Sequence, residues 1–282
     1  MTYPALISLH GGHSGQFCSH AKDCLEDLIQ AYIQKGFKQV GISEHMPPPT
    51  DQFLYPDEIR IGLNARDLID RFARYFKELD RLKIKYKDKI LIYKGFETET
   101  LSTGFDFIKE LIQQFNPDYI VGSVHHVNDI CFDYSREGYE AIAKTLGSVE
   151  AMYLAYFDAQ LEMIEALRPF VVGHFDLIRI FDKDFETRIN TPGIKKKIRR
   201  NLERIKALDL VLDYNLRPLS RGEDLPYPGT HILDQAKNLG IRVVPGDDAH
   251  SAEQAGAFVA EAIQEIEAKG FSTCWPAPEI KP

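Results

Sequence analysis

The amino-acid sequence predicts an α/β fold in which a largely parallel sheet is covered by helices. Three observations support this prediction: short apolar runs alternate with longer amphipathic stretches, the runs have the length of buried strands, and the alternation continues along the whole chain. A closed TIM-like barrel and an open, doubly wound sheet both fit the pattern. Because no tandem repeat, low-complexity tract or convincing linker interrupts it, we expect a single domain over residues 1–282.

Seven strands are expected, with helices between and after them. In chain order the strands cover residues 5–9, 39–43, 90–96, 119–124, 170–173, 210–214 and 241–245. The helix-like stretches cover residues 22–35, 65–83, 107–114, 139–167, 195–207, 230–238 and 252–268. Residues 46–64 include the run MPPPTDQF and are expected to form a loop.

The first expected helix has the clearest local signals. Leu25, Leu28 and Ile29 recur at helical spacing, so one face of this helix is apolar. Asp23 followed by Glu26 has the spacing of a capping box at its start, and a glycine follows its last turn.

The composition is that of an ordinary soluble globular protein, with 44% hydrophobic and 27% charged residues. A net charge of −8 disfavours a nucleic-acid partner, but a small anionic substrate fits if a metal site supplies positive charge. The four cysteines lack C-x-x-C spacing, which indicates reduced thiols and a cytoplasmic protein. The sequence has no signal-peptide pattern and no apolar run of membrane-spanning length, so no membrane partner is expected, and oligomeric state stays open.

Most of the nine histidines follow directly after an expected strand. Because the carboxyl ends of parallel strands meet at one face, where ligands gather, we expect these side chains to converge there. A single histidine in such a place is more often a cap or a packed core residue, but the joint placement favours a site. With two carboxylates, the set is His10, His13, His20, His45, Glu97, His125, His174, Asp248 and His250.

Three further residues have side chains of a type that binds metal or acts as a nucleophile. His231 falls on an expected helix and is interpreted as structural or peripheral. His126 neighbours His125, and only one of the two is expected to face the site, since adjacent strand residues point to opposite faces. Cys18 lies two residues from His20 and is a candidate nucleophile, but its neighbours fit a metal site better.

The residue types favour metal. Neutral imidazole and carboxylate are the usual ligands of zinc, manganese and iron, and they do not discriminate strongly among these ions. Seven histidines and two carboxylates are more ligands than one tetrahedral ion can bind. We therefore expect two or three divalent metal ions, with a carboxylate bridging between them.

The motifs resemble, in kind and order, those of the polymerase and histidinol phosphatase (PHP) family of metallophosphoesterases, especially its histidinol-phosphatase branch. They are SEH at 43–45, GFE at 95–97, GSVH at 122–125, GHFD at 173–176 and DAH at 248–250, together with HSGQFCSHA near the start. The resemblance covers residues 9–251 and implies a distorted barrel of seven βα units, with the metal site at the C-terminal ends of its strands. It also implies three ions, held by His10, His13, Glu97 and Asp248; by Glu97, His125 and His174; and by His20, His45 and His250.

The first motif departs from the family pattern. Family members usually have an aspartate followed by two histidines one residue apart, whereas this chain has Ser8 in place of the acid and two residues between His10 and His13. An H-x-H pair on a strand directs both rings to one side, but an H-x-x-H pair does so only if Gly11 and Gly12 bend the backbone. Both histidines are still expected to bind metal.

The resemblance implies hydrolysis of a phosphate monoester, and histidinol phosphate is the expected substrate, which places the reaction in histidine biosynthesis. Asp248 is expected in catalysis as well as in metal binding, and Asp176 either orients a ligand histidine or caps the next helix. Arg217, Arg221 and Asn215 are expected to bind substrate, because arginine pairs with phosphate through two donors. Glu44, Glu99 and Asp247 are candidate contacts to an amine or imidazole group.

Three alternatives stay open. The chain could act on another phosphate ester as a member of the same family. It could be a metal-dependent amidohydrolase, since those enzymes also use histidine-rich barrels, and release of ammonia or amine without phosphate would favour that function. It could also be a binding protein that has kept the fold without the activity.

Overall fold

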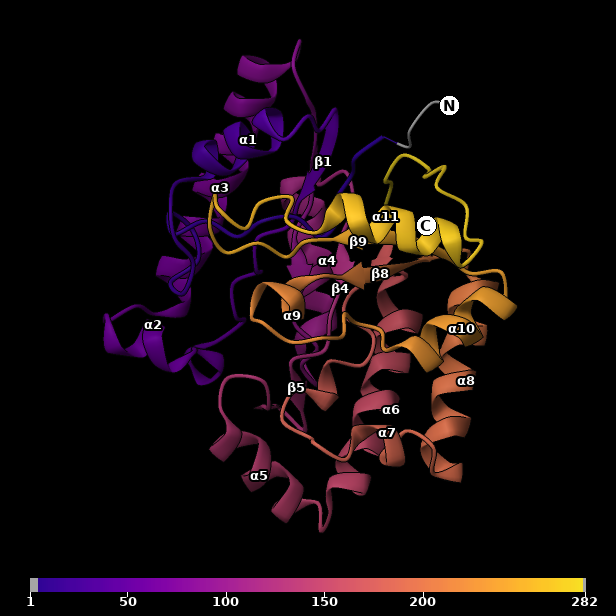
Figure 1. The fold of residues 1–282 in the computed structure, drawn as a ribbon. Coiled ribbons are helices and arrows are strands. Elements are labelled where there is room, and N and C mark those ends of the chain that lie inside the picture. Colours follow the sequence, from indigo (N-terminus) through magenta and orange to yellow (C-terminus); the bar gives the residue numbers. More distant parts are fainter. Residues whose placement is uncertain (1–4, 281–282) are drawn as a thin grey trace.

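Parallel strands lie at the centre of the molecule, and helices surround them (Figure 1). The computed structural model describes residues 5–280, so residues 1–4 and 281–282 of the expected single domain lie outside the described part of the chain. The strands are β1 (Gln39–Ile42), β2 (Leu91–Lys94), β3 (Glu97–Thr98), β4 (Val121–Gly122), β7 (Val171–Val172), β8 (Val211–Asn215) and β9 (Arg242–Gly246). A short antiparallel hairpin, β5 (His126–Val127) with β6 (Ile130–Cys131), follows β4.

The parallel strands form two sheets. One pairs β1 with β2, and the other has the order β3-β4-β7-β8-β9 with every pairing parallel. Three residues after β2, the chain begins β3, and a parallel bridge joins Glu97 of β3 to His45, just after β1. The α/β class with a parallel sheet is therefore confirmed, and the order of the strands follows the chain.

The expected first strand, residues 5–9, is not a regular strand. Its backbone nevertheless lies between the two sheets: Gly41 N donates to Ser8 O over 2.8 Å, and Leu9 N donates to Pro245 O over 3.1 Å. Because these are single bonds to different neighbours, they do not form the repeating ladder that defines a strand.

Helices follow or flank most strands. They are α1 (Leu25–Gln34), α2 (Pro56–Arg60), α3 (Ala65–Tyr86), α4 (Gly104–Phe115), α5 (Arg136–Thr145), α6 (Val149–Leu167), α7 (Phe185–Arg188), α8 (Pro192–Ala207), α9 (Arg217–Ser220), α10 (Thr230–Asn238) and α11 (Val259–Ala268), with 3₁₀ turns at Asp51–Phe53 and Leu177–Arg179.

Two helix predictions and one loop prediction need correction. The expected helix over 139–167 is two helices, because Gly147 adopts a φ of 90° and Ser148 caps the second by accepting from Ala151 N. The expected helix over 252–268 begins only at Val259, after Phe258 in the left-handed region. The expected loop over 46–64 contains α2, which begins with a proline at its first position.

Two layers of buried apolar side chains hold the fold together. The larger layer lies between strands and helices; α1, for example, buries Leu25, Leu28 and Ile29 completely. Each such side chain stabilises the fold by about 1.5–3 kcal/mol relative to an exposed one. The smaller layer joins the strands to the segment at residues 5–9, through Ile7, Leu9, Tyr119, Val121, Phe170, Val171, Val211 and Val244.

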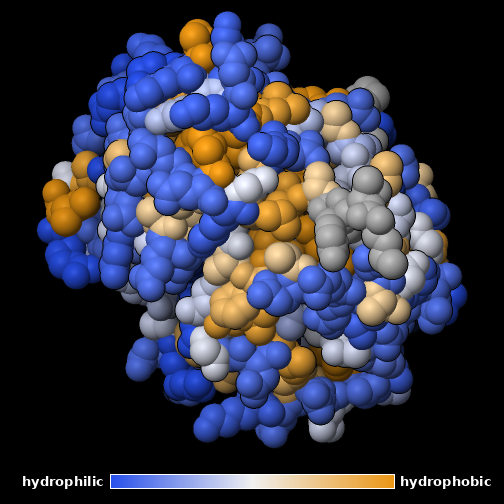
Figure 2. All heavy atoms as spheres, turned by 45° about the horizontal axis from the view of Figure 1, so that its top comes forward, coloured by the Kyte–Doolittle hydropathy of each residue, from blue (hydrophilic) through white to orange (hydrophobic). Residues whose placement is uncertain are grey.

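The surface is mostly hydrophilic on the face drawn in Figure 2, with hydrophobic atoms showing in a central area that polar and charged residues border. Within residues 5–280, the helices are too short or too polar to cross a membrane.

Candidate metal centre

The nine side chains that were expected to bind metal converge where the strands end. Their ligand atoms, with the thiol of Cys18, form overlapping groups in which all atoms lie within 4.8 Å of one another. The groups are His10, His13 and Glu97; Glu97, His125 and His174; His10, His174 and Asp248; His13, Asp248 and His250; and Cys18, His20, His45 and His250. Of the three ligand sets implied by the family resemblance, Glu97, His125 and His174 form one of these groups, and His20, His45 and His250 lie within another that also contains Cys18. The first implied set is divided between groups, since Asp248 groups with His10 or with His13 but not with Glu97.

Burial divides the cluster into an inner and an outer part. Seven of the nine residues are at most 8% exposed, whereas His45 is partly exposed and the His20 side chain is 41% exposed. The cluster is therefore a buried centre that opens toward solvent beside His20.

Glu97 lies at the middle of the cluster and faces two sides with its two oxygens. Oε1 lies 2.9 Å from His174 Nε2 and 3.2 Å from His10 Nε2. Oε2 lies 3.2 Å from His45 Nδ1 and 3.7 Å from His13 Nε2. This is the placement that a bridging carboxylate needs. Burial alone would raise the pKa of Glu97, but the charges of the surrounding histidines hold it well below its usual value.

Gly11 and Gly12 lie between the two histidines of the first motif, and both pack closely against neighbouring elements. A Cβ at Gly11 would lie 2.1 Å from Gly41 O, and a Cβ at Gly12 would lie 2.4 Å from a methyl carbon of Leu28. The backbone therefore sits against β1 and α1 at a distance that only glycine allows. Both His10 and His13 are completely buried and point into the cluster, with ring centroids 6.3 Å apart.

Ser8 does not replace a missing acid at the centre. Its hydroxyl donates to Asp247 Oδ1 over 2.8 Å, and Asp247 also accepts from Tyr32 Oη over 2.7 Å and from Gly256 N. Since Asp247 is buried and held by these donors, its position fits an anchor for the loop after β9 better than a contact to substrate.

Three buried carboxylates outside the expected set lie against its histidines, and two of them hydrogen-bond to a ring nitrogen. Asp213 Oδ2 accepts from His10 Nδ1 over 2.8 Å, and Glu99 Oε2 accepts from His125 Nδ1 over 2.8 Å. Glu44 Oε2 lies 3.6 Å from His13 Nδ1. A carboxylate on one ring nitrogen fixes the tautomer and leaves the other nitrogen free to bind metal. Asp213 was not predicted from the sequence, although an acid inside the apolar strand VLDYN is a usable signal.

Protonation in the metal-free centre follows from these carboxylates. Burial lowers the pKa of His13, but the nearby carboxylates of Asp248 and Glu44 outweigh burial and raise it to about 9. His10 behaves alike: Glu97 and Asp213 raise its pKa well above the usual value in spite of burial. Protons on these rings therefore balance the carboxylates until cations replace them.

The spacing of donor atoms fits a metal ion. His125 Nε2, His174 Nε2 and Glu97 Oε1 form a triangle with edges of 2.9, 3.2 and 3.4 Å. Four-coordinate zinc with Zn–N distances of about 2.0–2.1 Å holds its ligand atoms about 3.3–3.4 Å apart. In addition, His10 Nε2, His13 Nε2 and His45 Nδ1 are buried and lack a hydrogen-bond partner within the described chain. Buried polar atoms of this kind need a partner, and a cation supplies it.

The residues expected to bind substrate line a cavity over the cluster. Asn215, Arg217 and Arg221 border this space of about 290 Å³ together with seven of the expected metal ligands. Arg217 Nη1 donates to Asp248 O over 2.9 Å and contacts His250 Nδ1, so its guanidinium lies directly beside the centre. Asn215 donates to Asp213 Oδ2 over 3.0 Å and to Asp248 Oδ2 over 3.2 Å.

Asp176 has partners other than the ligand histidines. Its Oδ2 accepts from Arg179 Nε over 3.2 Å and from Gly229 N over 3.0 Å. It starts the 3₁₀ turn after β7 but makes no side-chain cap there. Its carboxylate therefore ties that turn to the loop before α10, and its catalytic role stays a prediction.

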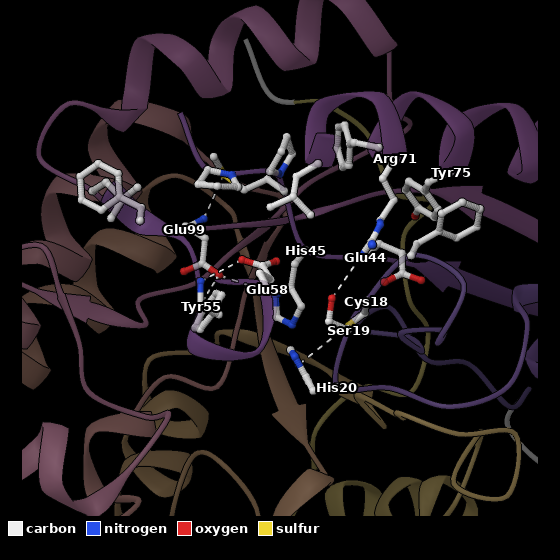
Figure 3. A pocket seen from close by; sticks show the side chains of 18 of the residues that line it. Cys18, Ser19, His20, Glu44, His45, Tyr55, Glu58, Arg71, Tyr75 and Glu99 are labelled. Carbon is white, nitrogen blue, oxygen red and sulfur yellow. Dashed lines mark hydrogen bonds and ion pairs between the residues drawn. The ribbon is translucent and has the colours of Figure 1, made fainter. Parts of the chain in front are cut away.

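The other histidines lie outside the cluster. His126 Nδ1 is 3.3 Å from Glu99 Oε2, and His126 lines a second cavity of about 40 Å³ beside the first. Figure 3 shows this second cavity, with Cys18, His20 and His45 pointing toward one another at its edge and Glu99 and Tyr55 on the other side of His45. His231 is exposed on α10.

Comparison with known proteins gives consistent matches along the chain. The PHP domain family matches residues 10–216. The "Probable histidinol-phosphatase" of Schizosaccharomyces pombe is 36% identical over 254 residues, which cover 89% of this chain and 82% of that protein. The histidinol-phosphatase of Saccharomyces cerevisiae is 28% identical over 283 residues, which cover 88% of this chain and 84% of that protein.

A solved structure has the same fold. It is the histidinol phosphate phosphatase of Lactococcus lactis in complex with zinc, L-histidinol and phosphate. The two structures superpose with a TM-score of 0.70 at 20% identity, over 95% of this chain and 94% of the other.

Proposed function

The chain belongs to the PHP domain family, and from that membership we propose that it is a histidinol-phosphatase, which hydrolyses L-histidinol phosphate to L-histidinol and phosphate. The observation that carries the proposal is the buried cluster of histidines around Glu97, with Arg217 beside it under one cavity. Such a centre suits a small anionic ester, and relatives that align over nearly the whole chain are named for this reaction.

We further propose that the parallel strands close into a distorted barrel of seven βα units. The bonds from residues 5–9 to both β1 and β9 support closure, since they join the free edges of the two sheets. The same proposal includes a single domain, a small phosphorylated substrate as partner and a cytoplasmic location.

Two or three divalent ions, zinc, manganese or iron, are proposed for the centre. His10, His13, Glu97 and Asp248 would hold the first; Glu97, His125 and His174 the second; and His20, His45 and His250 the third. When bound, the ions would activate a water molecule for attack and offset negative charge on the phosphoryl group.

The protein's own groups would bind and orient the substrate. Arg217 and Arg221 would donate to phosphoryl oxygens, and Asn215 would hold Asp248 in place through its amide. Asp248, in the left-handed region with a φ of 46°, presents Oδ1 3.2 Å from His13 Nε2. Asp176 would act through the loop that it anchors.

The leaving group requires an acid other than those expected from the sequence. Histidinol carries an ammonium and an imidazole, but Glu44 and Glu99 are occupied by histidines of the centre. Among the acids that line the larger cavity, Glu97 and Asp248 belong to the cluster, which leaves Asp133. We therefore propose Asp133, beside the β5–β6 hairpin, as the partner of the cationic end of the substrate.

Phosphate release from L-histidinol phosphate tests the proposal. Protein reconstituted with zinc or manganese is compared with chelator-treated protein, and an aryl phosphate serves as a generic ester. Metal-dependent turnover that strongly favours histidinol phosphate is the expected result. Slow, unselective phosphate release would favour another ester. Release of amine without phosphate would favour an amidohydrolase, and bound metal without turnover would favour a binding protein.

A further inference from the structure

A cysteine lies at the outermost of the three proposed ion sites. The ligand atoms of Cys18, His20, His45 and His250 are all within 4.8 Å of one another. Cys18 Sγ is 3.3 Å from His20 Nε2, and Figure 3 shows Cys18 directed toward His20 beside His45. The family resemblance assigns only the three histidines to this site.

We propose that Cys18 is the fourth protein ligand of this ion, so that the site consists of one thiolate and three imidazoles. The inference deepens the proposed function and rests on its metal centre. On binding, the thiol proton leaves to solvent and a sulfur–metal bond forms, while the oxidation state of the metal is unchanged.

The donor spacing fits this assignment. Zinc binds thiolate sulfur at about 2.3 Å and imidazole nitrogen at about 2.0–2.1 Å, so a tetrahedral ion holds sulfur and nitrogen about 3.5 Å apart. The distance of 3.3 Å between Cys18 Sγ and His20 Nε2 is close to that value. Both side chains belong to one short loop, so a small adjustment within the loop is enough to reach it.

The backbone fixes this loop against the rest of the site. Cys18 N donates to Ser14 O over 2.7 Å, and Lys22 N donates to His250 O over 2.8 Å. The second bond ties the loop to the segment that carries His250. Cys18 and His250 are therefore held together by hydrogen bonds of the main chain rather than by flexible side chains.

Burial separates Cys18 from the exposed Cys24 on the same segment. Cys18 is 6% exposed, whereas Cys24 precedes α1 and is exposed to solvent. A thiolate in such a place is stabilised chiefly by the cation that it binds. Cys24 is therefore a matched control: it has the same chemistry, lies six residues along the chain and is outside the cluster.

Two properties follow from four protein ligands. Four protein ligands would fill a tetrahedral site, so these residues would hold an ion that contributes charge and fixes the loop, and water activation would be left to the other ions. Thiolate favours zinc over manganese, so this site is expected to keep zinc when manganese fills the others.

Cobalt(II) binding tests the proposal without relying on activity. Cobalt is titrated into metal-free wild type, Cys18→Ser and Cys24→Ser, and absorbance is recorded from the near ultraviolet to the red. Wild type and Cys24→Ser should show a sulfur-to-cobalt charge-transfer band together with visible d–d bands. Cys18→Ser should lose the charge-transfer band and keep d–d bands from the other sites.

The outcomes distinguish this proposal from the proposed function. Visible d–d bands in wild type without a charge-transfer band, or a band that persists in Cys18→Ser, would overturn the cysteine ligand and leave the metal centre intact. No cobalt bands in any form would overturn the metal centre as well. X-ray absorption of zinc-loaded wild type needs no variant: a sulfur neighbour at about 2.3 Å is expected, and its absence would overturn the assignment.

Discussion

At the scale of single residues, Asp213 illustrates how a group that never touches substrate can set the metal centre. It accepts from His10 Nδ1, from Asn215 Nδ2 and from His174 N, over 2.8, 3.0 and 3.1 Å. These bonds fix the His10 ring with Nε2 toward Glu97. The carboxylate thus controls both the tautomer and the direction of one ligand.

Asp213→Asn should weaken metal binding about 10- to 100-fold, because an amide cannot stabilise the same tautomer as strongly. Competition with a chromophoric chelator measures the affinity. Asp209→Asn is the control, since Asp209 pairs with Arg242 and its side chain is 70% exposed. Equal metal affinity in wild type and Asp213→Asn would show that Asp213 does not orient a ligand.

Metal binding should release protons near neutral pH. The pKa of His13 in the metal-free centre is about 9 and that of His10 is also raised, so both rings are protonated there, and a cation must displace those protons. Apparent affinity should therefore rise with pH from neutral through about pH 9, where His13 loses its proton. Calorimetry in buffers of different ionisation enthalpy counts the protons; a count of zero at pH 7 would contradict this prediction.

Asp133→Asn should raise KM for histidinol phosphate roughly 10- to 100-fold, as expected for loss of one charged hydrogen bond. Turnover of an aryl phosphate, which has no cationic group, should change little. Steady-state kinetics on both substrates provide the measurement. An equal loss on the two substrates would assign Asp133 to the centre itself rather than to recognition of the leaving group.

At the scale of elements, a charged cluster joins α1 to α3. Glu26 on α1 accepts from Tyr86 Oη over 2.6 Å and pairs with Arg81 and Lys85 on α3. Hydrogen bonds from Lys85, Tyr86 and Arg81 lower the pKa of Glu26 to about 2. The pairs lie near the surface, so screening by solvent keeps each of them weak.

The pKa of Glu26 predicts how this cluster responds to acid. Because the folded-state value lies below the ordinary value of 4.5, its stabilisation is present above about pH 4.5 and is lost as pH falls toward 2. Glu26→Gln should therefore lower the free energy of unfolding at pH 7 and make little difference near pH 2. Urea unfolding at both pH values tests this, with the exposed Glu110→Gln on α4 as the control. A pH-independent difference would exclude the ionic origin.

Sequence patterns predicted which strands and helices exist better than they predicted where each one begins and ends. Alternating apolar runs identified β1, β8 and β9 because their burial is continuous. The break between α5 and α6 was missed because apolar spacing continues on both sides of Gly147, while its left-handed backbone is set by the turn. Residues 5–9 were apolar enough for a strand, but the pairing with two different neighbours could not be read from the residues alone.

At the scale of the whole molecule, the centre joins distant parts of the chain. The convergence of the nine side chains was predictable, since it needs only the rule that parallel strands end at one face. The partners of those side chains were not: Glu44, Glu99 and Asp213 depend on distances between strands. The expected metal binding of each of the nine residues remains a prediction for the experiments above.

Metal removal should lower the thermal stability of the entire fold. An ion that binds only the folded protein, at a free concentration 100 times its Kd, stabilises it by about 2.7 kcal/mol. For a chain of this size that corresponds to a fall in Tm of roughly 5–10 °C on chelation. Scanning calorimetry with and without chelator measures it, and His231→Ala, outside the cluster, should show the same fall as wild type. An unchanged Tm would mean that the ions do not bridge the fold.

The pairing of the first segment with the last strand also has a consequence for biosynthesis. His10 and His13 leave the ribosome early, but Leu9 pairs with Pro245, His13 N donates to Ala249 O, and Asp248 N donates to His10 O. At about 5–20 residues per second, roughly 12–48 s separate the synthesis of His10 from that of Asp248. During that interval the early histidines are exposed on a nascent chain without their partners, so the complete centre forms only after β9 has been translated.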